Sequence, residues 1–314
     1  MSRFASDVSF LACTEYDRER IAAAIDALTA PLVLPNLHGS RVLLKPNLIS
    51  TAGPALASTA AEFAAGAAIW LREQGAQVFL GDSPAFGSAQ RVCDRHGISE
   101  ALHGLEVELV EFHHAVRTRL ACGVTLPIAV EALECDLLVG LPRIKAHQQM
   151  YVTLALKNLF GVVKGTHKSL LHMKLGGDDA HARFARIIFD LHLLFPHQLH
   201  LIDGIVAMHR SGPMNGEPLP LGVVGASLSP VALDSAVLSL LKVNREASPL
   251  WQVARELACP GWDVAELNFP LKKPDEFLLP YFATPAQLNP VRFSILRYLG
   301  GMGRRLFKEP FRHL

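Results

Sequence analysis

Short runs of Val, Leu and Ile alternate with helical segments along the chain, and this alternation restricts the folds that it can adopt. A continuous apolar run such as RVLLKPN (41–47) is typical of a strand that is buried on both faces. Because such strands need a layer of helices on each side, the sequence predicts an α/β fold with a mostly parallel sheet and helices on both faces. The predicted strands are 8–14, 41–47, 77–84, 107–112, 136–142, 199–207 and 221–227, and the predicted helices are 17–29, 59–74, pieces of 87–103, 150–160, 182–195, 230–242 and 249–258.

The composition is that of a globular protein of one large or two modest domains. Half of the 314 residues are hydrophobic and 19% are charged, which is enough apolar surface for a large core. The formal charge of +1 provides no global field for polyanions, so no nucleic-acid partner is expected. The apolar stretch 223–241 contains Pro230 and Asp234, which favours a strand followed by a helix over a membrane span.

The cysteines and the short motifs exclude several kinds of chemistry. The five cysteines are scattered without a CxxC pair, so neither an iron–sulfur cluster nor a structural zinc site is expected. MSRFASDVSF, at the start, has no long apolar stretch, and together with the cysteine usage this predicts a cytoplasmic location. HExxH, GxGxxG and GxSxG are absent, and GVVKGTHKS lacks the spacing of a phosphate loop. The identity of any other cofactor or metal stays open.

Polar residues gather where the predicted strands end, which is where doubly wound sheets bind ligands. Lys145 and His147 are two residues apart, so in an extended segment both would point to one side, and the lysine would keep the imidazole neutral as a general base. Lys157 interrupts the apolar run VTLALKNLFGVV, so it needs an anionic partner or a lowered pKa. We predict His147, Lys145 and Lys157 as catalytic residues. The predicted ligand-binding residues are Lys45, Asn47, Asp82, Ser83, Asn158, Lys164, Asp203, Gly204, Gly212 and Gly216.

Ordinary turn chemistry is an alternative explanation for several of these residues. Pro46 would stop a strand and Asn47 would then cap the turn that follows. GDSP (81–84) would form an Asx-turn in which Asp82 accepts backbone N–H groups. Residues 203–218 would form a long loop, whose glycines would let the backbone approach a ligand.

The end of the chain differs in character from the rest. Residues 268–290 contain five prolines and predict an irregular wrap. Residues 291–314 combine six Arg and Lys residues with one Glu and an apolar face, and they predict a helical appendage. We therefore divide the chain into an α/β domain, 1–265, and a Pro-rich wrap with a basic amphipathic tail, 266–314. The tail would contact an anionic membrane surface at the inner membrane face, bind a protein partner or pack on its own domain.

Six ordered blocks of the sequence resemble successive motifs of the domain of unknown function 362 family. They are LLKPNLIS, STAAEF…LREQGAQVFLGDSP, CDLLVGLPRIKAH, TLALKNLFGVVKG, LIDGIVAMHRSGP and SPVALDSAV, with His172 among them, within about residues 8–245. The resemblance implies an α/β fold, and the family is also similar to the nickel-pincer lactate racemase type of protein, which works with lysines and histidines on a small hydroxy acid. Many members carry a ferredoxin-type cluster domain, whose cysteines this chain lacks. Members often have His where this chain has Ala60, so any role of that His is missing or moved here.

Two functional hypotheses follow. The first is an enzyme that acts on a small anionic metabolite, a carboxylate or a phosphate, with Lys145 and Lys157 binding the anion and His147 transferring a proton. Asn47 and Asp82 would orient the lysines, and Asp203 with the glycine loop would close the pocket. The alternative is a non-catalytic accessory or redox-partner protein that holds a ligand or a partner's cofactor and has no cluster of its own.

Overall fold

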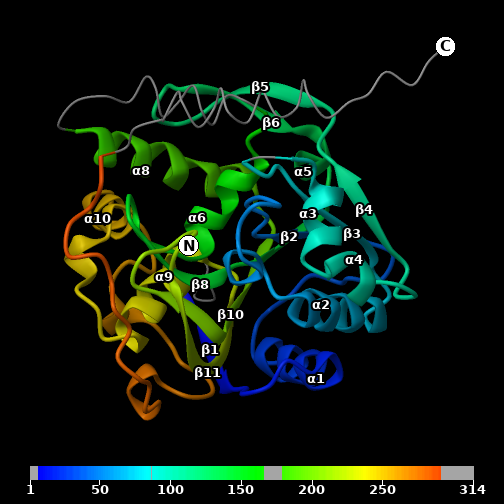
Figure 1. The fold of residues 1–314 in the computed structure, drawn as a ribbon, viewed down its shortest axis with the longest axis horizontal. Helices are drawn as coiled ribbons and strands as arrows, with labels where there is room; N and C mark the ends of the chain where they lie inside the picture. The colour runs from blue at the N-terminus through cyan, green and yellow to red at the C-terminus, as the bar shows by residue number, and fades with distance from the viewer. Residues whose placement is uncertain (1–5, 86, 166–178, 291–314) are drawn as a thin grey trace.

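The computed structural model describes residues 6–85, 87–165 and 179–290, in which a nine-stranded sheet lies between two layers of helices (Figure 1). The main path of the sheet is β1-β11-β10-β7-β2-β3-β4, and β8 and β9 extend it beside β10. The pairs β10–β7, β7–β2, β2–β3, β3–β4 and β10–β8 are parallel, which confirms the predicted mostly parallel sheet. The strands are β1 Ser9–Ala12, β2 Arg41–Pro46, β3 Gln77–Asp82, β4 Val107–Glu111, β7 Leu137–Leu141, β8 Arg143–His147, β9 Tyr151–Thr153, β10 Gln198–His209 and β11 Glu217–Ser227.

Helices cover both faces because the central strands present apolar side chains in both directions. In β2, Val42 and Leu44 belong to one core cluster and Leu43 to the other, as the two-residue period of a strand requires. The first cluster holds α1 Arg18–Thr29, α2 Ala61–Glu73, α3 Ala89–Arg95 and α4 Ile98–Ala101. The second holds α5 Val130–Leu133, α6 Ala155–Asn158, α8 Ala180–Asp190 and α10 Pro249–Glu256, and α9 Pro230–Leu240 packs with β1, β10 and β11.

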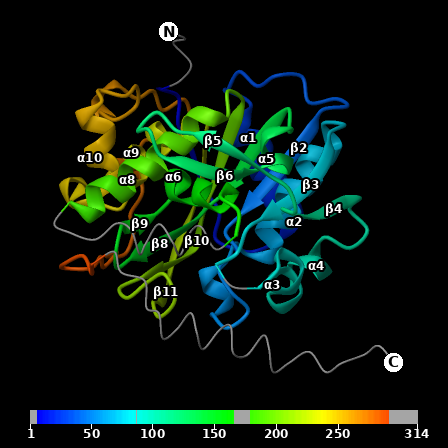
Figure 2. The same ribbon diagram turned by 90° about the horizontal axis from the view of Figure 1, so that it is seen from above.

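The strand β8 carries the polar side chains past the ends of its neighbours. Pro142 divides one extended path into β7 and β8, and β10 is long enough to pair with both. The last residue of β2, Pro46, pairs with Leu141, so every residue of β8 lies beyond the carboxyl end of β2. In Figure 2, β8, β9 and the ends of β10 and β11 lie together at the lower edge of the view. This edge is therefore where residues from different elements meet.

Three segments differ from the sequence-based expectations. The first residues of the predicted helix 150–160 form strand β9 instead, because Thr153 pairs with Lys145 of β8. Helix α6 begins only at Ala155. The expected long loop 203–218 is mostly strand, because β10 and β11 continue their antiparallel pairing to His209 and Glu217. Residues left without assignment form the hairpin of β5 Ala115–Arg119 and β6 Thr125–Ala129.

The Pro-rich segment follows an irregular path, as expected, with one 3-10 turn at Pro274–Glu276. Phe277 and Phe282 anchor it in the core beside α9. The predicted helical appendage, 291–314, lies outside the described residues, and so does His172; the division at residue 265 stays a prediction. Within the described ranges, the structure contains no helix that is long and apolar enough to cross a membrane.

Replacement of Gly66 tests how closely α1 approaches α2. An added Cβ would lie 2.5 Å from Ile21 Cγ2 and 2.9 Å from the Arg18 carbonyl oxygen. Gly→Ala within a helix ordinarily stabilises by about 1 kcal/mol. Here we expect Gly66→Ala to lower the free energy of unfolding by about 1–3 kcal/mol in urea titration, because the helices must separate.

The exposed residue Glu73, on the same helix, is the matched control, and Glu73→Ala should change that free energy by less than about 0.5 kcal/mol. A Gly66→Ala variant as stable as the parent would contradict the packing described here.

Candidate functional site

Four basic side chains point into the interior beyond the carboxyl ends of the parallel strands. Lys45 comes from the end of β2, Arg143 and Lys145 alternate along β8, and Lys157 comes from α6. Lys45 and Lys145 are fully buried, Arg143 is 5% exposed and Lys157 is partly exposed. Because a buried cation is costly unless it is paired, the partner of each one decides what it can do.

Lys45 is neutralised by Asp82 at the end of the neighbouring strand. Its Nζ lies 3.0 Å from Asp82 Oδ1 and donates to the Pro46 carbonyl at 2.8 Å. Burial lowers the pKa of Lys45, and the Asp82 carboxylate opposes that shift. At Gly161, an added Cβ would overlap both Asp82 Oδ1 and Lys45 Nζ, so the backbone closes directly over the pair. This buried ion pair therefore joins the end of β2 to the end of β3.

Two amide side chains connect this pair to β8 and α6. Asn47 Nδ2 donates to Asn158 Oδ1 at 2.6 Å, and Asn158 Nδ2 donates to the Lys45 carbonyl at 2.9 Å. Asn47 Oδ1 accepts the Arg143 backbone N–H at 3.0 Å. The predicted site residues Lys45, Asn47, Asp82 and Asn158 thus form one buried network that holds three elements in place.

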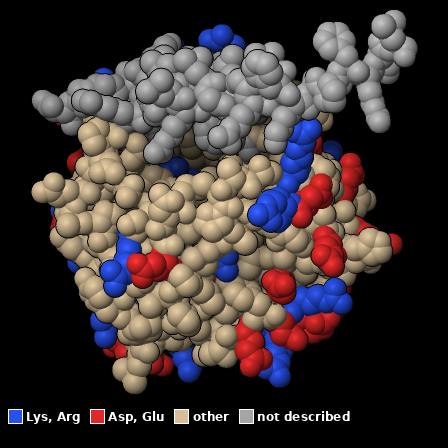
Figure 3. Space-filling view, viewed as in Figure 1, with Lys and Arg blue, Asp and Glu red and all other residues tan. Residues whose placement is uncertain are grey.

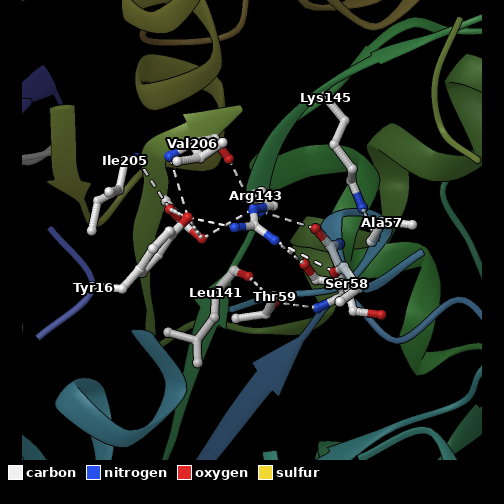
Figure 4. A network of polar contacts seen from close by, with 12 residues as sticks. Tyr16, Ala57, Ser58, Thr59, Leu141, Arg143, Lys145, Ile205 and Val206 are labelled. Atoms are coloured by element: carbon white, nitrogen blue, oxygen red, sulfur yellow. Dashed lines mark hydrogen bonds and ion pairs between the residues drawn. The ribbon is translucent and has the colours of Figure 1, made fainter. Parts of the chain in front are cut away.

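Arg143 is neutralised by Asp203 and held by Tyr16 (Figure 4). Arg143 Nε lies 3.4 Å from Asp203 Oδ2, and the Tyr16 hydroxyl donates to Asp203 Oδ1 at 2.9 Å while accepting from Arg143 Nη2. The guanidinium also donates to the carbonyls of Val206 and Ser58, both at 3.0 Å. Asp203 is fully buried in these contacts, so its expected role in closing a pocket gives way to a role as the counter-ion of Arg143.

Lys145 has no such counter-ion among the described residues. Figure 4 shows Arg143 and Lys145 reaching from the same strand towards residues 57–59, and Lys145 Nζ donates to the Ala57 carbonyl at 2.6 Å. Burial lowers the pKa of Lys145 well below its usual range, and the charges of Arg143 and Lys157 lower it further. The hydroxyl of Thr153, its cross-strand neighbour, is buried and has no hydrogen-bond partner in the described part of the chain. The Lys145 amine and the Thr153 hydroxyl therefore have hydrogen-bonding capacity that no described residue uses.

Lys157 also lacks a carboxylate within ion-pairing distance in the described ranges. Its Nζ lies 5.0 Å from the centre of the Phe160 ring and 5.8 Å from that of Phe184. Burial lowers the pKa of Lys157 to about 8, with a further lowering by Lys45 that Asp82 opposes. The amine thus lies over two aromatic rings near a cation, and the residue as a whole is partly exposed.

The imidazole of His147 is oriented by its own backbone. Nδ1 accepts the N–H groups of Gln149 at 3.1 Å and Met150 at 3.2 Å. These two donors favour the neutral tautomer with its proton on Nε2. In this tautomer, Nδ1 of His147 accepts from the backbone and Nε2 carries the proton.

The remaining predicted residues lie apart from the unpaired lysines or serve packing. Lys164 donates to the His113 carbonyl, and the Ser83 N–H donates to the Gly161 carbonyl at 3.1 Å. Gly204 packs against Ile144 and Val223. At Gly212 and Gly216, an added Cβ would overlap the Ala146 carbonyl and Met208, so these glycines admit protein atoms and not a ligand.

Sequence analysis missed Arg143, Tyr16, Thr153 and Asp234. Arg143 has a sequence signal, because it precedes Lys145 by the same two-residue step that separates Lys145 from His147. Tyr16 has none, because it meets Asp203 from 187 residues away. Asp234 accepts the N–H groups of Ala155 and Leu156 at 2.7 and 3.2 Å at the start of α6, and burial raises its pKa to about 8.

A cleft of about 720 Å³ lies beside the 3-10 turn Ala55–Ala57, whose last residue accepts the hydrogen bond from Lys145. Tyr16, Arg143 and the start of α2 line it, including Ala60. In the described ranges, no three His, Cys, Asp or Glu side chains lie close enough together to hold a metal ion, so these residues provide no ligand set for an iron–sulfur cluster.

The fold and the polar network together define a doubly wound α/β protein with buried lysines at the carboxyl edge of its sheet. The chain belongs to the family described as Domain of unknown function (DUF362), which matches residues 42–239. It is 34% identical over 315 residues to the thylakoid-associated protein sll1697 of Synechocystis, covering 96% of both chains.

Two solved structures have a weaker likeness. One is the lactate racemase apoprotein from Thermoanaerobacterium thermosaccharolyticum, with a TM-score of 0.46 and 14% identity over 76% of this chain and 57% of that one. The other is a protein from Thermotoga maritima, with a TM-score of 0.40 and 13% identity over 67% of this chain and 56% of that one.

Asp82→Asn tests the buried ion pair that joins β2 to β3. It leaves the fully buried Lys45 without its counter-ion, so we expect it to lower the free energy of unfolding by about 3–5 kcal/mol. Adding Lys45→Met removes the unpaired charge and should restore part of that loss in urea titration. If the losses in unfolding free energy caused by Asp82→Asn and by Lys45→Met simply add in the double variant, the two side chains are not coupled.

Proposed function

We propose that the protein is an enzyme that acts on a small anionic metabolite, a carboxylate or a phosphate, bound by Lys145 and Lys157. One observation carries the proposal: in the described ranges, Lys45 and Arg143 each have a carboxylate partner, whereas Lys145 and Lys157 have none. Two amines that repel each other in a poorly solvated site bind protons weakly, and an anion between them would remove that penalty.

The surrounding groups suit such a ligand. Lys145 would bind the anion by a charge-assisted hydrogen bond, and the unused Thr153 hydroxyl lies beside it as a further donor. His147 would donate its Nε2 proton to an oxygen that gains negative charge during the reaction, and would recover it afterwards. Asn47, Asn158 and Asp82 would act indirectly, because they hold β8 and α6 in position.

Binding of oxalate and of inorganic phosphate to the full chain, measured by titration calorimetry, tests the site. We expect Lys145→Met and Lys157→Met each to weaken the affinity about 10- to 100-fold, the effect of losing one charge-assisted hydrogen bond. Lys164→Met is the matched control, because that lysine donates to the His113 carbonyl, and its affinity should equal that of the parent. Unchanged binding in both lysine variants would overturn the assignment, and binding of small acids without any turnover would favour the accessory-protein alternative.

The same titration should depend on pH in a defined direction. The free Lys157 amine has a pKa of about 8 and that of Lys145 is well below the usual lysine range, and a bound anion raises both. Binding should therefore take up protons near neutral pH, and the affinity should fall as the pH rises through about 8. Repeating the titration in buffers of different ionisation enthalpy measures the proton uptake, and proton release would contradict the proposal.

We also propose that residues 291–314 attach the protein to an anionic membrane surface. The support is the excess of six basic residues over one acidic residue in this segment, together with the name of the thylakoid-associated relative. Deletion of 291–314 should abolish sedimentation with vesicles that contain anionic lipid, and leave the thermal unfolding midpoint unchanged. Vesicles of neutral lipid are the control. Full vesicle binding by the truncated chain would exclude the tail as the anchor.

A further inference from the structure

Of the four basic groups, Lys157 is the one that combines three properties that favour nucleophilic attack. Among the described residues it has no ion pair or hydrogen bond, since its contacts are the rings of Phe160 and Phe184. It lies close enough to Lys45 for that cation to disfavour its protonation. The residue as a whole is partly exposed, whereas Lys45 and Lys145 are fully buried and bound to carbonyl oxygens.

We propose that Lys157 forms an imine with the carbonyl carbon of a small oxo acid, so that the substrate class is a carboxylate with an aldehyde or ketone group. This inference rests on the proposed function, because it uses the same anion site and names the substrate within it. A lysine that is desolvated by an apolar wall, or that stands beside another cation, is the usual form of an imine-forming amine in proteins.

The reaction needs no further reagent. The lone pair of the neutral Lys157 amine attacks the carbonyl carbon, and the electron pair of the C=O bond moves to oxygen, which takes the first of the two amine protons. The resulting carbinolamine loses that oxygen as water, which carries away the two protons of the amine, and the C=N bond forms. A protonated imine then withdraws electrons from the neighbouring carbon atoms, which eases loss of a proton or of carbon dioxide from them.

The setting of Lys157 suits each part of this substrate. Phe160 and Phe184 exclude water from one side of the amine, which protects an imine from hydrolysis. The carboxylate of the oxo acid would pair with Lys145, whose charge interacts with that of Lys157 in the folded protein. Figure 3 shows a hollow in this face beside the grey atoms, with Lys or Arg atoms at its edge.

Reductive trapping tests the inference. The full chain is incubated with pyruvate or glyoxylate and sodium borohydride, and the product is analysed as intact protein and as peptides by mass spectrometry. We expect one reduced adduct, on Lys157. At pH 7.5 a pKa of about 8 gives Lys157 a neutral fraction on the order of a hundredfold larger than that of a surface lysine, so its labelling should be correspondingly faster and should rise between pH 6 and pH 8.

Lys157→Arg cannot form an imine, so it should lose the adduct, and the affinity of the parent for oxalate, which has no reactive ketone, reports separately on the anion site. Lys164→Arg is the control and should be labelled like the parent. Labelling spread over many lysines, or no adduct in a parent that binds oxalate, would overturn the imine and leave the proposed anion site intact. A parent that does not bind oxalate, with no adduct, would overturn the proposed function as well.

Discussion

The imbalance of buried charge at the carboxyl edge of the sheet is the constraint on which the site depends. Lys45 and Arg143 are neutralised by Asp82 and Asp203, and both pairs are held within hydrogen-bond networks. Burying a charge without a partner costs several kcal/mol, and each pair avoids that cost. Lys145 and Lys157 gain no such partner in the described ranges, so their amines are the ones that respond to a ligand or to pH.

The hydrogen bonds around the Lys45–Asp82 pair also fix the positions of Lys145 and Lys157. Asn47 and Asn158 join the end of β2 to β8 and to α6, which are the elements that carry Lys145 and Lys157. Asp234 fixes the start of α6 from α9, and Gly161 lets the backbone close over the Lys45–Asp82 pair. A site built on such supports loses little conformational freedom when a ligand binds, which favours both affinity and catalysis.

Membership of the DUF362 family describes the fold and names no reaction. The buried lysines at the carboxyl edge of the sheet are what this structure adds to that description, and Ala60 lines the cleft beside Arg143.

By itself the sequence determined the α/β class, because alternating apolar strands and helices leave few other ways to cover a sheet. It also identified Lys157 as unusual, because this lysine interrupts an apolar run. Only the tertiary structure decided which carboxylate meets which cation. Tyr16 reaches Asp203 across 187 residues, β9 replaces the first turn of a predicted helix by pairing with β8, and the glycines at 212 and 216 admit protein atoms. These outcomes depend on contacts between distant segments, and hydrophobic periodicity describes only neighbours along the chain.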